Sequence, residues 1–316
     1  MEDKIKLGIS RCLLGEKVRY DGGHKWDRFV TDTLGKFVDF VPVCPEVECG
    51  LGVPREAMHL EGNPADPRLI TIHTKVDHTD RMKNWIRKRI AELEKEDLCG
   101  FIFKSSSPSS GMERVKVYGG KGEPIKTGVG LFAKGFMARF PLLPVEDDGR
   151  LHDPQLRENF IERIFALKRW RDVTVQKAGL KPLVDFHTSH KFLILSHSRK
   201  HYQQMGQLVA RTGPMPLKER FDTYQALFLE ALRIKTTPKK HADVLLHMMG
   251  FFKKDLSPDE KQEMLEIIDH YKKGLIPLVV PITLLLHFVR KYDQPYLKNQ
   301  VYLEPHPLEL KLRNHV

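Results

Sequence analysis

Cysteine is scarce in this sequence, with only 4 in 316 residues and at irregular spacing. So few cysteines exclude a disulfide scaffold, and we expect reduced thiols that are free for metal binding or catalysis. The sequence also lacks an apolar run of the roughly 20 residues that a membrane-spanning helix needs. Its longest run, residues 275–289, is interrupted by Pro277 and Pro281 and predicts a buried helix. Because the N-terminus shows no secretion signal, we expect a cytoplasmic protein without membrane contact. The sequence gives no evidence of an obligate protein partner.

Positive charge is in excess: 52 Lys and Arg stand against 41 Asp and Glu, a net charge of +11. Such a balance favours a polyanionic partner, because cationic side chains that neutralise phosphates release counterions. A protein that is merely basic and soluble is the alternative. The excess continues in residues 181–316, with 21 Lys and Arg against 14 Asp and Glu and with 10 of the 15 histidines.

The first 150 residues alternate short apolar runs with amphipathic stretches, a pattern typical of α/β proteins. We predict strands at 4–10, 38–44 and 99–104, a strand and turn over 114–122, and helices at 24–37, 78–97 and 127–140. This alternation favours a Rossmann-like, mostly parallel sheet in domain 1–150. A connecting helix and linker over 151–180 and an all-α domain over 181–316 follow. Within the latter, SPDE at 257–260 predicts a capped helix start.

Three of the cysteines are expected at one edge of the sheet. In parallel sheets ligands bind outside the carboxyl ends of the strands. The loops that leave those ends carry Cys12, the pair Cys44 and Cys49, and the serine-rich segment 105–110. Cys99 begins its strand and is expected at the opposite edge.

Four interpretations of this cysteine cluster are open from the residues alone. The thiols could be small buried apolar side chains, or one could be a nucleophile with a nearby base. They could also bind zinc, although C-x4-C is an uncommon spacing for zinc. A fourth possibility is an iron–sulfur cluster held by three thiolates.

Three motifs resemble the bacterial thiouracil/thiouridine desulfidase family: RCLLGEKVRYDGG (11–23), PVCPEVECGLGVPRE (42–56) and KSSSPSSGMERVKVY (104–118). The second half resembles the YbgA-like helical domain, through DFHTSHK (185–191), HADVLLHMMGFFKK (241–254) and PHPLELKLRNHV (305–316). The resemblance implies a non-redox enzyme with a [4Fe–4S] cluster on three cysteines. It implies conversion of 4-thiouridine in tRNA to uridine with release of sulfide.

The resemblance assigns two cluster ligands to Cys12 and Cys44. The third ligand in the family is the cysteine of an SPSCG motif, and this chain has Ser110 at that place. Because a serine hydroxyl is a poor ligand for cluster iron, either the cluster is lost or another thiol replaces the missing one. Cys49 is the candidate replacement.

Glu46 is the carboxylate best placed between the cysteines to act as general base toward water. Capping of backbone N–H groups is its structural alternative. Ser109 resembles the functional serine of the family and is expected to position the water or a ring oxygen. The other expected substrate contacts are Arg19, Tyr20, Asp21, Arg55, Lys104 and Ser110.

The helical domain is expected to hold the phosphates of tRNA while the thiolated base is exposed to the site. Two alternatives stay open. The substrate could be 2-thiouracil or another thiolated nucleobase, or the chain could be a non-catalytic RNA-binding protein that has lost the cluster.

Overall fold

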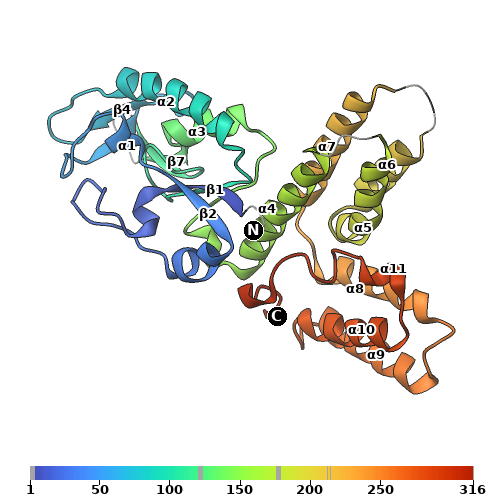
Figure 1. Cartoon of the computed structure of the whole chain (residues 1–316). Helices are drawn as coiled ribbons and strands as arrows, with labels where there is room; N and C mark the ends of the chain where they lie inside the picture. The colour runs from blue at the N-terminus through green and yellow to red at the C-terminus, as the bar shows by residue number, and fades with distance from the viewer. Residues whose placement is uncertain (1–3, 120–123, 176–178, 212, 214, 316) are drawn as a thin grey trace. The chain divides into compact units, whose positions relative to one another are not determined.

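The computed structural model describes residues 4–119, 124–175, 179–211, 213 and 215–315. The chain divides into two compact units, Met1–Leu156 and Arg157–Val316. The first unit contains all the strands found in the described residues, and the second is helical (Figure 1). This confirms the predicted fold class, an α/β part followed by an all-α part. Residues 176–178 of the expected linker lie outside the described residues.

The first sheet consists of four parallel strands in the order β2-β1-β5-β8. Their bounds are β1 (Ile5–Ser10), β2 (Val38–Val43), β5 (Phe101–Phe103) and β8 (Val145–Asp147). The central strands are almost entirely buried. Burial on both faces explains why β5 is a continuous apolar run and why β1 is apolar apart from Lys6 and Ser10, rather than alternating.

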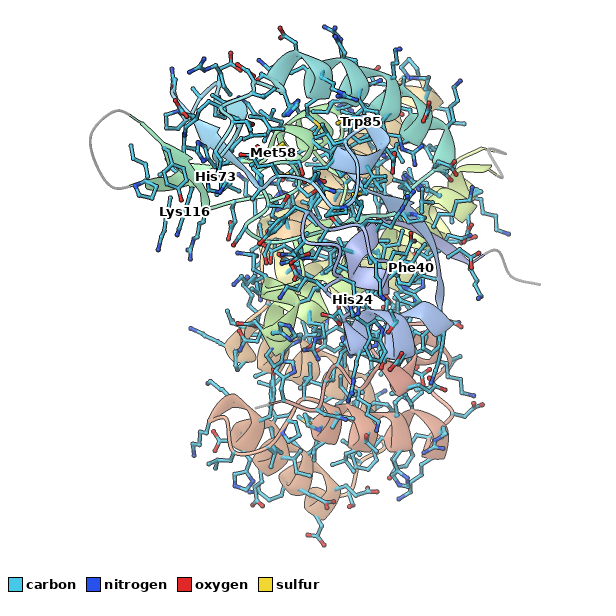
Figure 2. All side chains as sticks on the ribbon, turned by 90° about the vertical axis from the view of Figure 1, so that its left-hand side faces the viewer. His24, Phe40, Met58, His73, Trp85 and Lys116 are labelled. Carbon is cyan, nitrogen blue, oxygen red and sulfur yellow. The ribbon has the colours of Figure 1, made fainter. Side chains whose placement is uncertain are left out.

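A second sheet was largely absent from the sequence-based prediction. It has the order β4-β3-β6-β7, with β3 (Met58–Glu61), β4 (Arg68–Thr71), β6 (Val115–Tyr118) and β7 (Ile125–Gly128). Strands β3 and β6 pair in parallel, and the outer strands pair antiparallel to them. Figure 2 labels Met58 on β3 and Lys116 on β6. Of these strands only β6 was predicted, as part of the strand and turn over 114–122, and residues 120–122 of that prediction lie outside the described residues.

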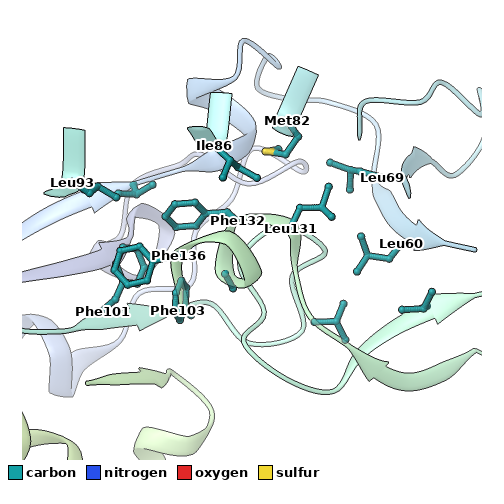
Figure 3. Close-up of a cluster of buried hydrophobic side chains, with 14 of the residues drawn as sticks. Leu60, Leu69, Met82, Ile86, Leu93, Phe101, Phe103, Leu131, Phe132 and Phe136 are labelled. Atoms are coloured by element: carbon teal, nitrogen blue, oxygen red, sulfur yellow. The ribbon is translucent and has the colours of Figure 1, made fainter. Parts of the chain in front are cut away.

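The amphipathic helix α2, the mostly apolar helix α3 and aromatic side chains build the core of the first unit. Helices α2 (Thr79–Leu93) and α3 (Leu131–Arg139) lie within the predicted 78–97 and 127–140. Figure 3 shows Phe132 and Phe136 of α3 facing Phe101 and Phe103 of β5. The rings of Phe101 and Phe103 stack with centroids 4.4 Å apart. This packing attaches α3 to the sheet beside the strand that leads to the serine-rich loop.

The predicted helix at 24–37 is wrong in extent. The structure has a π-helical turn at Phe29–Thr33 and a 3₁₀ turn at Leu34–Lys36. The Asp27 carboxylate accepts a hydrogen bond from the Val30 amide at 3.0 Å, so the helical backbone starts after Asp27. A short polar side chain that competes for backbone donors in this way is a common helix start.

The second unit contains eight α-helices among its described residues, at α4 (Pro154–Val175), α5 (Lys181–His197), α6 (Arg199–Ala210), α7 (Leu217–Arg233), α8 (Pro238–Met249), α9 (Pro258–Lys272), α10 (Val279–Lys291) and α11 (Pro295–Lys298). The predicted cap is confirmed, because Ser257 and Glu260 form a reciprocal capping box at the start of α9. The apolar run at 275–289 leads into α10, with Pro281 in its first turn, where a missing N–H costs little. Among the described residues no helix is both long and apolar enough to cross a membrane.

A buried ionic network ties α4 to the C-terminal segment of the second unit. His197 Nε2 lies 2.5 Å from Glu162 Oε1, and His197 Nδ1 lies 2.6 Å from the Ile234 carbonyl oxygen. Both ring nitrogens of His197 thus face oxygen acceptors. Arg313 approaches the same carboxylate at 3.4 Å and Glu158 at 3.2 Å. Burial raises the pKa of Glu162, but these cations oppose it more strongly and lower that pKa to about 2.

Replacing Glu162 with Gln is expected to lower the free energy of unfolding by about 3–5 kcal/mol at pH 7, because it leaves two buried cations without their shared partner. The folded-state pKa of Glu162 lies below its ordinary value of 4.5. Its stabilising contribution is therefore complete above about pH 4.5 and is lost as the pH falls toward 2.

Urea unfolding of the full chain at pH 7 and pH 3 measures both effects. Glu263→Gln, at an exposed site, is the matched control and should change stability by less than about 0.5 kcal/mol. Equal stability of the two variants would contradict the role of the network.

Candidate active site

The carboxyl ends of the four parallel strands meet at one edge of the first sheet. Cys12 follows β1, Cys44 follows β2, Lys104 follows β5 and Asp148 follows β8. A cavity of about 440 Å³ opens there, and the first three of these residues line it. This is the place where a parallel α/β sheet binds its ligands.

Eight of the eleven residues singled out from the sequence line this cavity: Cys12, Arg19, Tyr20, Cys44, Glu46, Arg55, Lys104 and Ser110. Three others do not. Ser109 is fully buried behind the wall. Asp21 lies in a turn, where its carboxylate accepts the Gly23 amide at 2.9 Å. Cys49 does not line the cavity either.

Glu46 is the centre of the polar contacts at the cavity wall. It lies in α1 (Pro45–Glu48), the short helix that follows Cys44. Its Oε1 accepts the Ser109 hydroxyl at 2.5 Å, while Oε2 lies 3.6 Å from Cys44 Sγ and 3.9 Å from Arg55 Nη2. Ser109 thus touches the carboxylate rather than the cavity. It can hold the orientation of Glu46, which makes it a positioning residue.

The serine-rich loop is held in place by the N-terminus of α3. The amides of Phe132 and Ala133 donate to the Ser109 carbonyl oxygen at 2.9 and 3.1 Å. Gly130 permits this approach, since a Cβ there would lie 2.5 Å from the Ser109 carbonyl group. The Ser107 hydroxyl accepts the Ser110 amide at 3.0 Å, which closes the loop on itself. The loop therefore presents Ser110 to the cavity from a fixed backbone.

Lys104 is paired with a carboxylate that the sequence analysis missed. Its Nζ lies 2.9 Å from Asp148 Oδ2, and Asp148 also accepts the Ser105 amide at 2.6 Å. Although burial raises the pKa of Asp148, the Ser105 amide and Lys104 lower it overall. The signal that could have found Asp148 is its place directly after a strand in PVEDD, but β8 was not predicted.

The two cavity thiols are buried and favour their neutral form. Burial raises the pKa of Cys12 to about 11 and that of Cys44 to about 12. Glu48 fixes the backbone at Cys44, because its Oε1 accepts the Cys44 amide at 2.8 Å. Glu48 is itself held by Arg89 at 3.2 Å. A rigid backbone at a cysteine suits either a ligand to a metal or a substrate contact.

The structure does not bring Cys49 to the cavity. Cys44 and Cys49 cap opposite ends of α1. Cys49 Sγ lies 3.3 Å from the Glu46 carbonyl oxygen, and its side chain packs against the hydrophobic core cluster that contains Met82 and Phe132. Residues five positions apart on a helix differ by about 140° in direction, which accounts for this separation.

The expected [4Fe–4S] cluster on Cys12, Cys44 and Cys49 does not fit this arrangement. The cavity wall offers two thiols and, at the third place, the Ser110 hydroxyl. Within the described part of the chain no group of three or more His, Cys, Asp or Glu side chains could hold a metal ion. The expected cluster requires three thiolates, and the cavity wall provides two thiols.

Two family models match the chain. Residues 7–148 match the model described as 2-thiouracil desulfurase. Residues 191–307 match a model described as a protein of unknown function, DUF1722. The first range contains all eleven residues singled out from the sequence, and the second lies within the helical unit.

Two known proteins are similar to parts of the chain. The uncharacterized protein YbgA of Escherichia coli (strain K12) is 29% identical over 153 residues, which are 48% of this chain and 90% of YbgA. A solved structure of the [4Fe-4S]-dependent thiouracil desulfidase TudS is 26% identical, with a TM-score of 0.40, over 48% of this chain and 95% of that one.

Ser110→Cys is expected to create a cluster site that the natural chain lacks. After anaerobic reconstitution with iron and sulfide, this variant should hold about four of each per chain, and the unchanged protein far less. The reason is that a third thiol would then face the cavity from the fixed serine-rich loop. Cys49→Ser is the control and should leave the iron content of the unchanged protein as it was. Four irons in the unchanged protein that disappear in Cys49→Ser would show instead that Cys49 reaches the cavity.

Proposed function

Because residues 7–148 form a domain of the 2-thiouracil desulfurase family and a YbgA-like domain follows, we propose that this chain is a desulfidase of thiolated pyrimidine bases. The resemblance of the three sequence motifs to this family is thereby confirmed. As the specific reaction we propose the conversion of 4-thiouridine in tRNA to uridine with release of sulfide. The basic balance of residues 181–316, 21 Lys and Arg against 14 Asp and Glu, supports a polyanionic substrate.

The contact that carries this proposal is the Glu46–Ser109 pair at the wall of the cavity. A carboxylate that is held by a buried hydroxyl at 2.5 Å and faces a cavity is suited to take a proton from water. Arg55, which lines the same cavity, has a buried Nε without a partner among the described residues. Its Nη2 lies 3.9 Å from Glu46 Oε2, so Arg55 places a guanidinium beside the carboxylate that faces the cavity. Lys104 adds a cation on the side of the serine-rich loop.

The reaction balances as a hydrolysis. The oxygen of water bonds to the ring carbon that carries sulfur, Glu46 accepts a proton, and the carbon–sulfur bond then breaks. Sulfur leaves as hydrosulfide, the ring regains a carbonyl group, and one proton is released to solvent. No oxidant or reductant is consumed. Since the donor set does not fit the expected cluster, every step here belongs to the side chains of the cavity.

A second candidate function is supported by one specific observation. Ser110 stands where the family has its third thiol, and Cys49 does not face the cavity. A chain that has lost the cluster in this way could bind thiolated RNA without turnover. The two candidates differ in whether the purified protein releases sulfide.

Glu46→Gln is expected to lower sulfide release about 10²–10⁴-fold, because the amide cannot accept the proton of water. The assay follows loss of the thiocarbonyl absorbance and formation of sulfide, with tRNA containing 4-thiouridine and with free 2-thiouracil as separate substrates. Glu16→Gln removes an exposed carboxylate near the cavity that does not line it, and should keep full activity. Full activity of Glu46→Gln would refute its role. Salt-dependent tRNA binding by a protein that releases no sulfide from either substrate would establish the second candidate.

A further inference from the structure

One loop of the first unit borders the cavity of the candidate active site and is tied to it through the backbone. We call residues 15–28 the rim loop. The Lys25 amide donates to the Cys12 carbonyl oxygen at 2.9 Å. At the other end of the loop, the Arg55 amide donates to the Tyr20 carbonyl oxygen at 2.8 Å. Since Tyr20 and Lys25 both line the cavity, the rim loop forms part of its wall with a fixed backbone.

Two aromatic side chains of the rim loop are exposed. Tyr20 is 44% exposed and Trp26 is 47% exposed, whereas the other two tryptophans of the chain are buried or half-buried. Figure 2 labels His24, which lies in the same loop. The Arg19 guanidinium lies 5.4 Å from the centroid of the Tyr20 ring, and that of Arg28 lies 5.5 Å from the Trp26 ring. A guanidinium covers at most one face of a ring, so much of each side chain stays open to solvent. A single exposed aromatic residue needs no explanation, but two on one short loop beside a cavity indicate a contact surface.

The Trp26 ring is held in its exposed position. Its Nε1 donates to the Thr31 hydroxyl at 2.8 Å. A Cβ at Gly15 would lie 3.6 Å from Trp26 Cδ1, so this edge of the ring lies against the backbone of the loop. Because the indole N–H already has its acceptor, Trp26 offers a partner its apolar ring. A ring that is fixed in advance loses little conformational freedom when a planar group stacks on it.

The rim loop also carries exposed cations in excess of its free carboxylates. Each of its carboxylates has a basic partner: Glu16 lies 3.5 Å from Arg11, Asp21 3.6 Å from Arg19 and Asp27 4.0 Å from His152. Lys17, Lys25 and Arg28 are exposed and form no ion pair within the described part of the chain. Exposed aromatic rings next to unpaired cations are the combination that binds single-stranded nucleic acid, since the rings stack on bases and the cations neutralise phosphates.

A thiolated base within an RNA needs such a surface beside the cavity. The base has to leave its stack to enter the cavity, so the nucleotides next to it lose a stacking neighbour. We propose that the rim loop holds the RNA strand that flanks the thiolated base, with a neighbouring base stacked on Trp26 and phosphates at Lys17 and Arg28. Tyr20, which is exposed and lines the cavity, is the aromatic contact at its mouth. Because the substrate base then has to be part of an RNA, the role of the rim loop rests on the proposed function.

Binding of the full chain to tRNA that contains 4-thiouridine, measured by fluorescence anisotropy, tests this proposal. Trp26→Leu should weaken binding about 10-fold, a typical effect of removing one aromatic side chain on which a base stacks. Trp26→Phe should keep most of the affinity. Tyr118→Leu, at an exposed aromatic residue of β6 that does not line the cavity, is the matched control and should bind as the unchanged protein does. In Trp26→Leu the ratio of kcat/KM for tRNA to kcat/KM for free 2-thiouracil should fall by a similar factor.

The salt dependence of the same binding tests the cations. Lys17→Gln should reduce the slope of log affinity against log salt by about 1, because one phosphate contact is lost. Lys88→Gln, which removes an exposed cation of α2, is the control and should leave the slope unchanged. If Trp26→Leu fails to fold, the comparison of these two lysine variants decides.

The outcomes separate the rim loop from the proposed function. Equal tRNA affinity of Trp26→Leu and the unchanged protein, or equal weakening by Trp26→Leu and Tyr118→Leu, would overturn the role of the rim loop alone. A chain that binds no tRNA and releases sulfide only from free 2-thiouracil would overturn the tRNA reaction and the rim loop together. Since binding is measured without turnover, a chain that binds tRNA but releases no sulfide still reveals whether Trp26 contacts the RNA.

Discussion

The parallel pairing of β1, β2, β5 and β8 is the constraint on which the candidate active site depends. Parallel strands release their loops at one edge, so residues about 90 and 135 positions from Cys12 meet beside it. The resulting site brings uncharged and charged groups together: the buried neutral thiols, the Glu46 carboxylate and the Lys104–Asp148 ion pair. Such a mixture is costly in a stable core and is found where function requires it.

The serine-rich loop shows how a site can keep its shape while its chemistry changes. Its backbone is fixed by the N-terminus of α3 and by the absence of a Cβ at Gly130, neither of which involves the side chain at position 110. A cysteine and a serine have nearly the same shape, so the loop can present either to the cavity. Replacing the cysteine with serine therefore leaves the backbone of the loop unchanged. The same replacement removes a thiolate that a metal cluster would need.

The sequence predicted the parts of this structure that have strong local signals. Helix α2 has a clear apolar face, and β1, β2 and β5 are mostly apolar segments between loops. Strands β3, β4 and β7 have four residues each and mix apolar with polar or charged side chains, as in MHLE, RLIT and IKTG, so no apolar run marks them in the sequence. Cys49 illustrates a different limit. From the spacing alone, Cys49 was expected to join Cys44 as a cluster ligand. In the structure the short helix between Cys44 and Cys49 directs the two thiols away from each other. Ser109 likewise contacts Glu46 rather than the cavity, which only the three-dimensional structure reveals.

The buried polar groups of the second unit fall into two kinds. Glu162, His197 and Arg313 satisfy one another, so their charges lock α4 to the C-terminal segment and leave little for a ligand. His190 and Gln300 are as deeply buried, each 3% exposed, yet each keeps one free atom. Stability alone would favour apolar residues at such positions, because an unpaired buried acceptor is a net cost. The first set therefore stabilises the attachment of α4 to the C-terminal segment, whereas the unpaired atoms of the second set oppose the stability of the packing around α5.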